Sequence, residues 1–141
     1  MAKFLILLFL AFASGCASNQ NTQKPDAITG EWYGTPLTDS RTDPGSEVTK
    51  QQIEMAKASK LVLLADHTFK LSLLVDIEGR WSREGEKILL HPKTIGGTPT
   101  NTPDEKGQSV SAKDLVGKWS SGEIRLPATE PPWVGVLFKK R

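Results

Sequence analysis

The chain has 141 residues, and 18 lysines and arginines against 16 aspartates and glutamates give it a formal net charge of +2. Nucleic-acid binding requires clustered positive charge, so this near balance leads us to expect no nucleic-acid partner. The length fits one domain of ordinary size. Cys16 is the only cysteine, which excludes a disulfide within the chain.

The stretch from Lys3 to Cys16 has the pattern of an export signal. Lys3 is followed by an unbroken apolar run of ten residues, Phe4 to Ala13, which has the proportions of the hydrophobic region of a secretory signal peptide. A transmembrane helix needs about 20 such residues, so the run is too short to span a bilayer. We therefore predict that residues 1–15 are a signal peptide.

Small residues lead into the cysteine in the sequence Ala13-Ser14-Gly15-Cys16. This segment resembles the lipobox of bacterial lipoproteins. The resemblance implies cleavage before Cys16, a diacylglyceryl group on its sulfur, and acylation of the new amino terminus with a fatty acid such as palmitate. The alternative is an ordinary secretory signal, because Ala11-Phe12-Ala13 fits the Ala-x-Ala cleavage pattern. That alternative leaves Cys16 as an unpaired thiol.

Residues 16–29 are predicted to be the lipidated start of the mature chain and a flexible tether, because they are polar and unpatterned. Two or more acyl chains suffice for stable anchoring in a bilayer. We therefore expect the protein to reside at a membrane of the bacterial cell envelope. An Asp after the lipidated cysteine tends to retain lipoproteins in the inner membrane of diderm bacteria, so Ala17 favours the outer membrane.

Residues 30–141 are predicted to form a single β domain. Its first strand is expected around Gly30-Glu31-Trp32-Tyr33-Gly34, where aromatic residues stand between glycines. The pair Asp43-Pro44 is typical of a helix start. We predict a helix over residues 46–58, with an apolar stripe so narrow that it covers the end or edge of a core.

The segment 60–92 carries the clearest β pattern. Apolar residues alternate with other residues over 69–75, which indicates a strand with one buried face. Asp66 and His67 stand where a tight hairpin turn is expected, and His enters the left-handed region more readily than most residues. The other strands predicted by the pattern lie near residues 61–64, 78–83, 86–91 and 133–138.

A Gly-x-Trp hairpin pattern occurs twice. Segment 79–92 and segment 117–127 both contain Gly-x-Trp-Ser, a glycine turn, an aliphatic strand and a proline. We predict that the same hairpin is used twice. The polar stretch 93–113 between them is predicted to be a long polar loop, either disordered or a loose excursion from the sheet.

The order of these motifs resembles the small lipocalin-like lipoproteins of bacteria. It consists of an early Gly-x-Trp at Gly30, a helix, an Asp-x-Thr-Phe turn at Asp66, a second Gly-x-Trp at Gly79, and a last strand ending in Phe138-Lys139-Lys140. The resemblance implies an antiparallel barrel or half barrel of about seven to eight strands, with the helix over one opening. It implies no catalytic residues.

Sequence signatures of catalysis are missing. The chain has no Gly-x-Ser-x-Gly elbow and no Ser-x-x-Lys pair. His67 and His91 are the only histidines, and neither has a second ligand at the spacing of a metal site. A site that brings the two histidines together in space is left open. We therefore expect no enzyme activity, no metal and no cofactor.

Four tryptophans are the candidate ligand-binding residues, and they have two interpretations. They either anchor the core or line a cavity for an apolar ligand, as in barrels with open mouths. We predict a membrane-anchored, non-enzymatic binding module for an apolar or lipid-like ligand. The alternative is a structural or partner-binding envelope lipoprotein with a filled core. The residues are Trp32, Trp81, Trp119 and Trp133.

Overall fold

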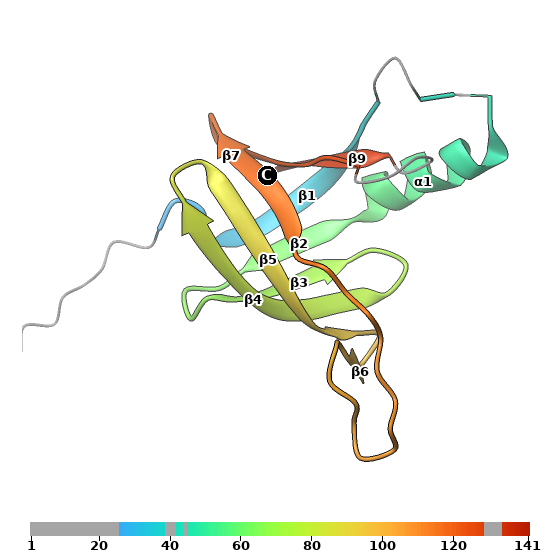
Figure 1. Ribbon diagram of the computed structural model, residues 1–141. Helices are drawn as coiled ribbons and strands as arrows, with labels where there is room; N and C mark the ends of the chain where they lie inside the picture. Colours follow the sequence, from blue (N-terminus) through green and yellow to red (C-terminus); the bar gives the residue numbers. More distant parts are fainter. Residues whose placement is uncertain (1–25, 39–41, 44, 129–133) are drawn as a thin grey trace, which may run out of the picture.

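The computed structural model describes residues 26–38, 42–43, 45–128 and 134–141. The described chain is mainly β, with nine strands and one helix (Figure 1). In chain order the elements are β1 (Gly30–Leu37), α1 (Glu47–Ala58), β2 (Lys60–Leu63), β3 (Thr68–Ser72), β4 (Asp76–Glu84), β5 (Lys87–Ile95), β6 (Thr98–Pro99), β7 (Leu115–Ser120), β8 (Glu123–Leu126) and β9 (Gly135–Lys139).

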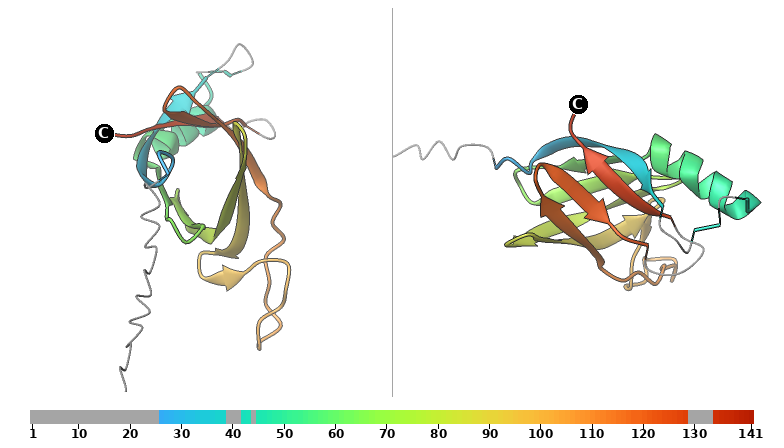
Figure 2. Two further views of the ribbon diagram at one scale, coloured as in Figure 1. Left: turned by 90° about the vertical axis from the view of Figure 1, so that its left-hand side faces the viewer. Right: turned by 90° about the horizontal axis from the view of Figure 1, so that it is seen from above.

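Eight of the strands form a closed antiparallel barrel in the order β1-β2-β3-β4-β5-β7-β8-β9. Pairing of β9 with β1 closes it, with Phe138 opposite Gly34, and Figure 2 shows the barrel end-on. The short strand β6 pairs only with β5 and lies outside the ring. The prediction of a small antiparallel barrel is therefore confirmed, with one strand added to it.

Side chains from every strand of the barrel fill its interior. The alternation read from the sequence holds, because Phe69 and Leu71 are buried while Thr68 and Lys70 face outward. Complete burial of one such aliphatic or aromatic side chain contributes about 1.5–3 kcal/mol. The buried cluster consists of Ile28, Trp32, Ala56, Leu61, Leu63, Phe69, Leu71, Trp81, Ile88, Leu90, Ile124, Val136 and Phe138.

Helix α1 packs against the end of β1, within one residue of the predicted range. Ala56 is its buried apolar residue. A Cβ on Gly34 would collide with the Ser59 hydroxyl and the Ala56 carbonyl, so glycine is what lets the helix end lie on the strand. The Ser59 hydroxyl donates to the Ala56 carbonyl (2.7 Å) and ends the helix. As predicted, α1 covers an edge of the core.

The barrel has two distinct ends, which we name for what lies there. The tether end holds Asp26, the turns at 64–67, 85–86 and 121–122, and the last residues of β9; the helix end holds α1 and segment 96–114 (Figure 1). The prediction of a tether over 16–29 is wrong for its last four residues, since Ile28 is fully buried in the core. Residues 16–25 lie outside the described chain.

The long polar loop predicted over 93–113 begins later than expected and is partly ordered. Strand β5 continues to Ile95, β6 pairs with it, and Thr100 bridges to Val110. The Thr100 hydroxyl donates to the Pro92 carbonyl (2.7 Å), and the Asn101 side chain exchanges two hydrogen bonds with the backbone of Ala112. Polar side chains thus satisfy the backbone of this excursion, which is why it shows no apolar alternation.

Candidate functional site: a groove on the outer face of the barrel

The structure places two of the four tryptophans in the core. Trp32 and Trp81 are 1 % and 3 % exposed. Their indole Nε1 atoms donate to the carbonyls of Ile28 (2.9 Å) and Leu64 (3.0 Å). The rings therefore anchor the two sides of the barrel. Trp133 lies outside the described residues.

Trp119 differs from these two because its buried indole nitrogen has no hydrogen-bond partner in the described part of the chain. The Arg83 guanidinium lies 4.1 Å from the centre of its ring. This distance is short enough for a cation–π contact. The ring is half-buried at the tether end.

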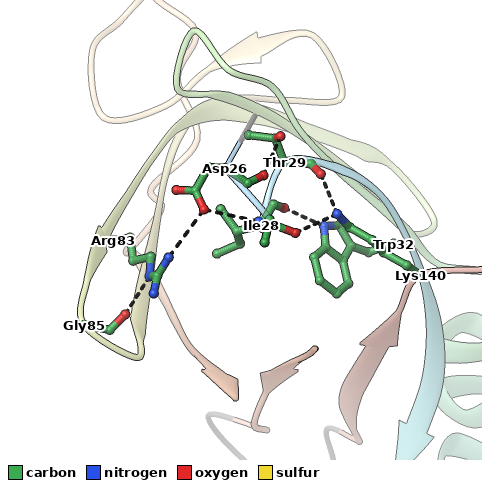
Figure 3. Close-up of polar contacts among 8 residues, drawn as sticks. Asp26, Ile28, Thr29, Trp32, Arg83, Gly85 and Lys140 are labelled. Carbon is green, nitrogen blue, oxygen red and sulfur yellow. Dashed lines mark hydrogen bonds and ion pairs between the residues drawn. The ribbon is translucent and has the colours of Figure 1, made fainter. Parts of the chain in front are cut away.

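Polar contacts hold the turn at residues 26–29 across the tether end (Figure 3). Lys140 Nζ donates to the carbonyls of Ala27 and Thr29, both at 2.7 Å, and lies 4.8 Å from the Trp32 ring centre. Arg83 reaches Asp26 at 3.5 Å and donates from Nε to the Gly85 carbonyl at 2.7 Å. At this end of the barrel the contacts fit the interpretation of the tryptophans as core anchors.

A groove with a volume of about 470 Å³ lies on the outer face of β2, β3, β4 and β5. Most of its surface is apolar, from Val62, Leu64 and the stems of longer side chains. Leu64, in the turn after β2, is 50 % exposed and contributes part of this apolar surface. The residues that line the groove are Val62, Leu64, Thr68, Phe69, Lys70, Glu78, Gly79, Arg80, Lys93 and Thr94.

An irregularity in the β4–β5 ladder shapes this groove, because Lys93 of β5 has no partner on β4. The register between β4 and β5 shifts between Glu78 and Gly79, and a Cβ on Gly79 would collide with the His91 carbonyl. Such a bulge bends a strand and increases its twist. Phe69 pairs across the strands with Gly79. The Phe69 side chain points into the core, so it is one of the lining residues without offering its ring to a ligand on the outer face.

Charged side chains rim the groove unequally. Lys70 is neutralised, because its ammonium lies 2.7 Å from Asp76 and 3.3 Å from Glu78. The hydrogen bond from Lys70, followed by that from Ser72, holds the pKa of Asp76 below its usual range. Within the described chain, no ion pair or hydrogen bond joins the side chains of Arg80 and Lys93 to a partner.

Arg80 acts at longer range on the neighbouring turn. The Asp66 carboxylate accepts hydrogen bonds from the Thr68 hydroxyl (2.6 Å) and backbone N–H (2.9 Å). These bonds lower the pKa of Asp66, and the charge of Arg80 lowers it further by a smaller amount. As predicted, His67 occupies the left-handed turn position, with φ 64°, and its ring lies against Trp81 with centroids 4.8 Å apart.

His91 takes part in a chain of polar contacts that the sequence did not reveal. Its Nδ1 lies 2.8 Å from Asp114, and its Nε2 lies 3.4 Å from the Ser82 hydroxyl. The order of atoms is that of a Ser-His-Asp triad. Ser82 however lies within the β4–β5 ladder, where backbone N–H groups serve the sheet and give no ready oxyanion hole. We assign to these three side chains the structural role of holding segment 111–114 against β5.

The described residues contain neither a metal-binding cluster nor a membrane-spanning helix. No group of three or more histidine, cysteine, aspartate or glutamate side chains within that part of the chain is arranged to hold a metal ion. None of the helices in the described chain is both long and apolar enough to traverse a bilayer. His67 lies at the tether end and His91 on the outer face of β5, so the structure does not show them sharing a site.

Sequence reasoning missed the groove and its two cations. Arg80 is the middle residue of a Gly-x-Trp motif, and period-two alternation beside the buried Trp81 places it on the outer face. That signal was available, but it does not show which side chains from other strands lie beside Arg80. Lys93 fell within the segment predicted to be a long polar loop.

Comparison with known proteins found no family model that matches the chain, no similar curated protein and no similar solved structure.

Proposed function

We propose that this chain is a membrane-anchored binding module of the bacterial cell envelope that takes an apolar or lipid-like ligand. The groove on β2–β5 carries the proposal, because about 470 Å³ lies within the range of about 300–1,000 Å³ typical of small-molecule sites. The sequence-based expectation placed the ligand inside the barrel. Side chains of the buried cluster occupy that space in the described chain, which excludes the expected internal site and is the arrangement that the structural or partner-binding alternative predicts. The present proposal therefore moves the ligand to the outer face.

The anchor in this proposal is lipid on Cys16. Ten residues separate Cys16 from Asp26 along the chain, and ten extended residues span at most about 33–36 Å. The tether end of the barrel would therefore lie within that distance of the membrane. Leu64, Thr68 and Arg80 lie toward this end, because they adjoin the β2–β3 turn. A ligand leaving the membrane would meet this end of the groove first.

Anchoring is tested by growing cells with a radioactive fatty acid. The natural chain should carry the label and sediment with membranes, whereas Cys16→Ser should lose the label and the membrane association. A label on Cys16→Ser, or a natural chain free of label, would contradict the lipoprotein proposal.

Ligand binding is tested by native mass spectrometry of protein purified from membranes. We expect an apolar molecule to remain bound, and Leu64→Asp to abolish its binding because a charge would enter the apolar surface. Leu74→Asp is the matched control, since Leu74 is 85 % exposed on the turn at the helix end, away from the groove. Equal binding by both variants would show that the ligand is not in the groove.

A protein partner is the second candidate, and one observation favours it. Leu74 and Val75 form an exposed apolar tip on the β3–β4 turn, and exposed apolar groups of this kind mark contact surfaces. On this alternative Leu74→Asp, and not Leu64→Asp, should abolish crosslinking to a partner in intact cells.

A further inference from the structure

The groove is apolar on one side and cationic on the other. Val62 and Leu64 belong to β2 and the residue after it, whereas Arg80, Lys93 and Thr94 belong to β4 and β5. Neighbouring strands lie about 4.7–4.9 Å apart, so roughly 10–14 Å separates the two sides. A ligand that fits both sides needs an apolar body with a charged or polar head at one end.

The cations on the β4–β5 side select the sign of that head. Lys70 already has two carboxylate partners, so it offers little further attraction. Arg80 and Lys93 form no such pair in the part of the chain that the structure describes, and both line the groove. An anionic head would therefore meet two available cations and the hydroxyl of Thr94, while Glu78 is held by Lys70.

A carboxylate suits this arrangement well. The planar guanidinium of Arg80 presents parallel N–H donors that match the two oxygens of a carboxylate. The apolar side of the groove is narrow, because Val62 and Leu64 lie along one edge of it, on β2 and the residue after it. This surface accommodates one acyl chain. We propose that the groove binds a long-chain fatty acid, with its carboxylate between Arg80 and Lys93 and its chain across β3 toward Val62 and Leu64.

This inference rests on the proposed function, and one experiment separates the two. The full chain is purified from membranes in a non-ionic detergent. It is then titrated with either of two probes, a long-chain fatty acid with a photoreactive diazirine in its chain or the fatty alcohol of the same length. After irradiation, mass spectrometry of peptides locates the crosslinks and gives the concentration that half-saturates labelling.

We expect the fatty acid to label the β2–β4 peptides at about a tenfold lower concentration than the alcohol, as for a hydrogen-bonded charge in an open site. Arg80→Gln combined with Lys93→Gln should remove this preference. Arg80→Lys combined with Lys93→Arg should retain most of it. Lys87→Gln combined with Arg125→Gln is the matched control for net charge, since both residues are exposed outside the groove, and it should change nothing.

The other possible results overturn either the fatty-acid site alone or the binding module as a whole. Equal labelling of the groove by both probes, or a preference that survives the loss of both cations, would refute the fatty-acid head site and leave an apolar-ligand module standing. Absence of labelling at the groove by either probe would refute the module as well. Unfolding curves of the variants serve to show that the substitutions leave the fold intact.

Discussion

The two Gly-x-Trp hairpins, β4–β5 and β7–β8, have the same local plan. In each the backbone N–H of the tryptophan donates to a backbone carbonyl in the turn of the preceding hairpin. Trp81 donates to His67 (2.8 Å), and Trp119 donates to Glu86 (2.7 Å). In each the glycine lies against its neighbour so closely that a Cβ would collide. The sequence repeat thus corresponds to a repeat of backbone structure.

The hairpins differ in what surrounds the indole. Trp81 is buried and bonds to the Leu64 carbonyl, while Trp119 is half-buried beneath Arg83 with an indole nitrogen that has no partner among the described residues. The difference teaches that a motif of a dozen residues specifies strand and turn, whereas the neighbours of its side chains come from distant parts of the chain. Four comparisons between the hairpins test this view.

Removal of the rings should give the largest difference. Trp81→Ala should lower the free energy of unfolding by about 3–5 kcal/mol, as for a buried aromatic residue. Trp119→Ala should lose about 1–3 kcal/mol, because its ring is already half-exposed. Urea unfolding measures both. Equal losses would mean that the two rings are equivalent in the core.

The glycines should respond in the same order. Alanine at Gly79 places a methyl group against the His91 carbonyl, which is backbone, whereas alanine at Gly117 meets first the end of the Leu126 side chain at 2.6 Å. A side-chain end can rotate away, but a paired strand cannot. Gly79→Ala should therefore cost about 3 kcal/mol and Gly117→Ala about 1 kcal/mol. Thermal unfolding measures both losses, and a larger loss for Gly117→Ala than for Gly79→Ala would contradict this prediction.

Phenylalanine substitutions isolate the indole nitrogens. Trp81→Phe removes the indole hydrogen bond to the Leu64 carbonyl, which still accepts from the His67 N–H (3.0 Å), and this loss costs about 1 kcal/mol beyond the lost area. Trp119→Phe removes a buried donor that has no partner in the described chain, so it should cost about 1–3 kcal/mol less than Trp81→Phe. If the two losses match, Trp119 has a partner in solution.

Acid should affect the β7–β8 hairpin through Glu123. Its hydrogen bond and ion pair with Lys139 hold the pKa of Glu123 below its usual 4.5. The stabilisation is complete above the unfolded pKa and is lost as the pH falls through the lower folded pKa. Glu123→Gln should therefore flatten the decline of stability below about pH 4.5. Melting temperatures from pH 7 to pH 3 measure this small effect.

Local patterns predicted much of the fold. Alternation located the strands around Phe69 and Trp81, and the sparse apolar stripe located α1 and its place at the edge of the core. The order within segment 93–113 was not predicted. Thr100 and Asn101 form it through side-chain hydrogen bonds to the backbone, and such bonds produce no alternation of apolar residues in the sequence.

The candidate site was harder to predict than the fold. Arg80 could be placed on the outer face, but its proximity to Lys93 depends on the bulge at Gly79 and on the pairing of β4 with β5. Likewise Ser82, His91 and Asp114 come together only after three strands are aligned. Cys16, which the sequence singles out most clearly, lies outside the described residues, so its lipidation remains a prediction.

Closure of the barrel has a consequence for folding during synthesis. Strand β1 pairs on one side with β2 and on the other with β9, about a hundred positions later along the chain. Contacts between such distant segments form slowly, because a long loop must be ordered before they contribute stability. A chain emerging from the ribosome cannot close until its last strand is made. Until then β1 keeps an unpaired edge on the side that β9 later covers.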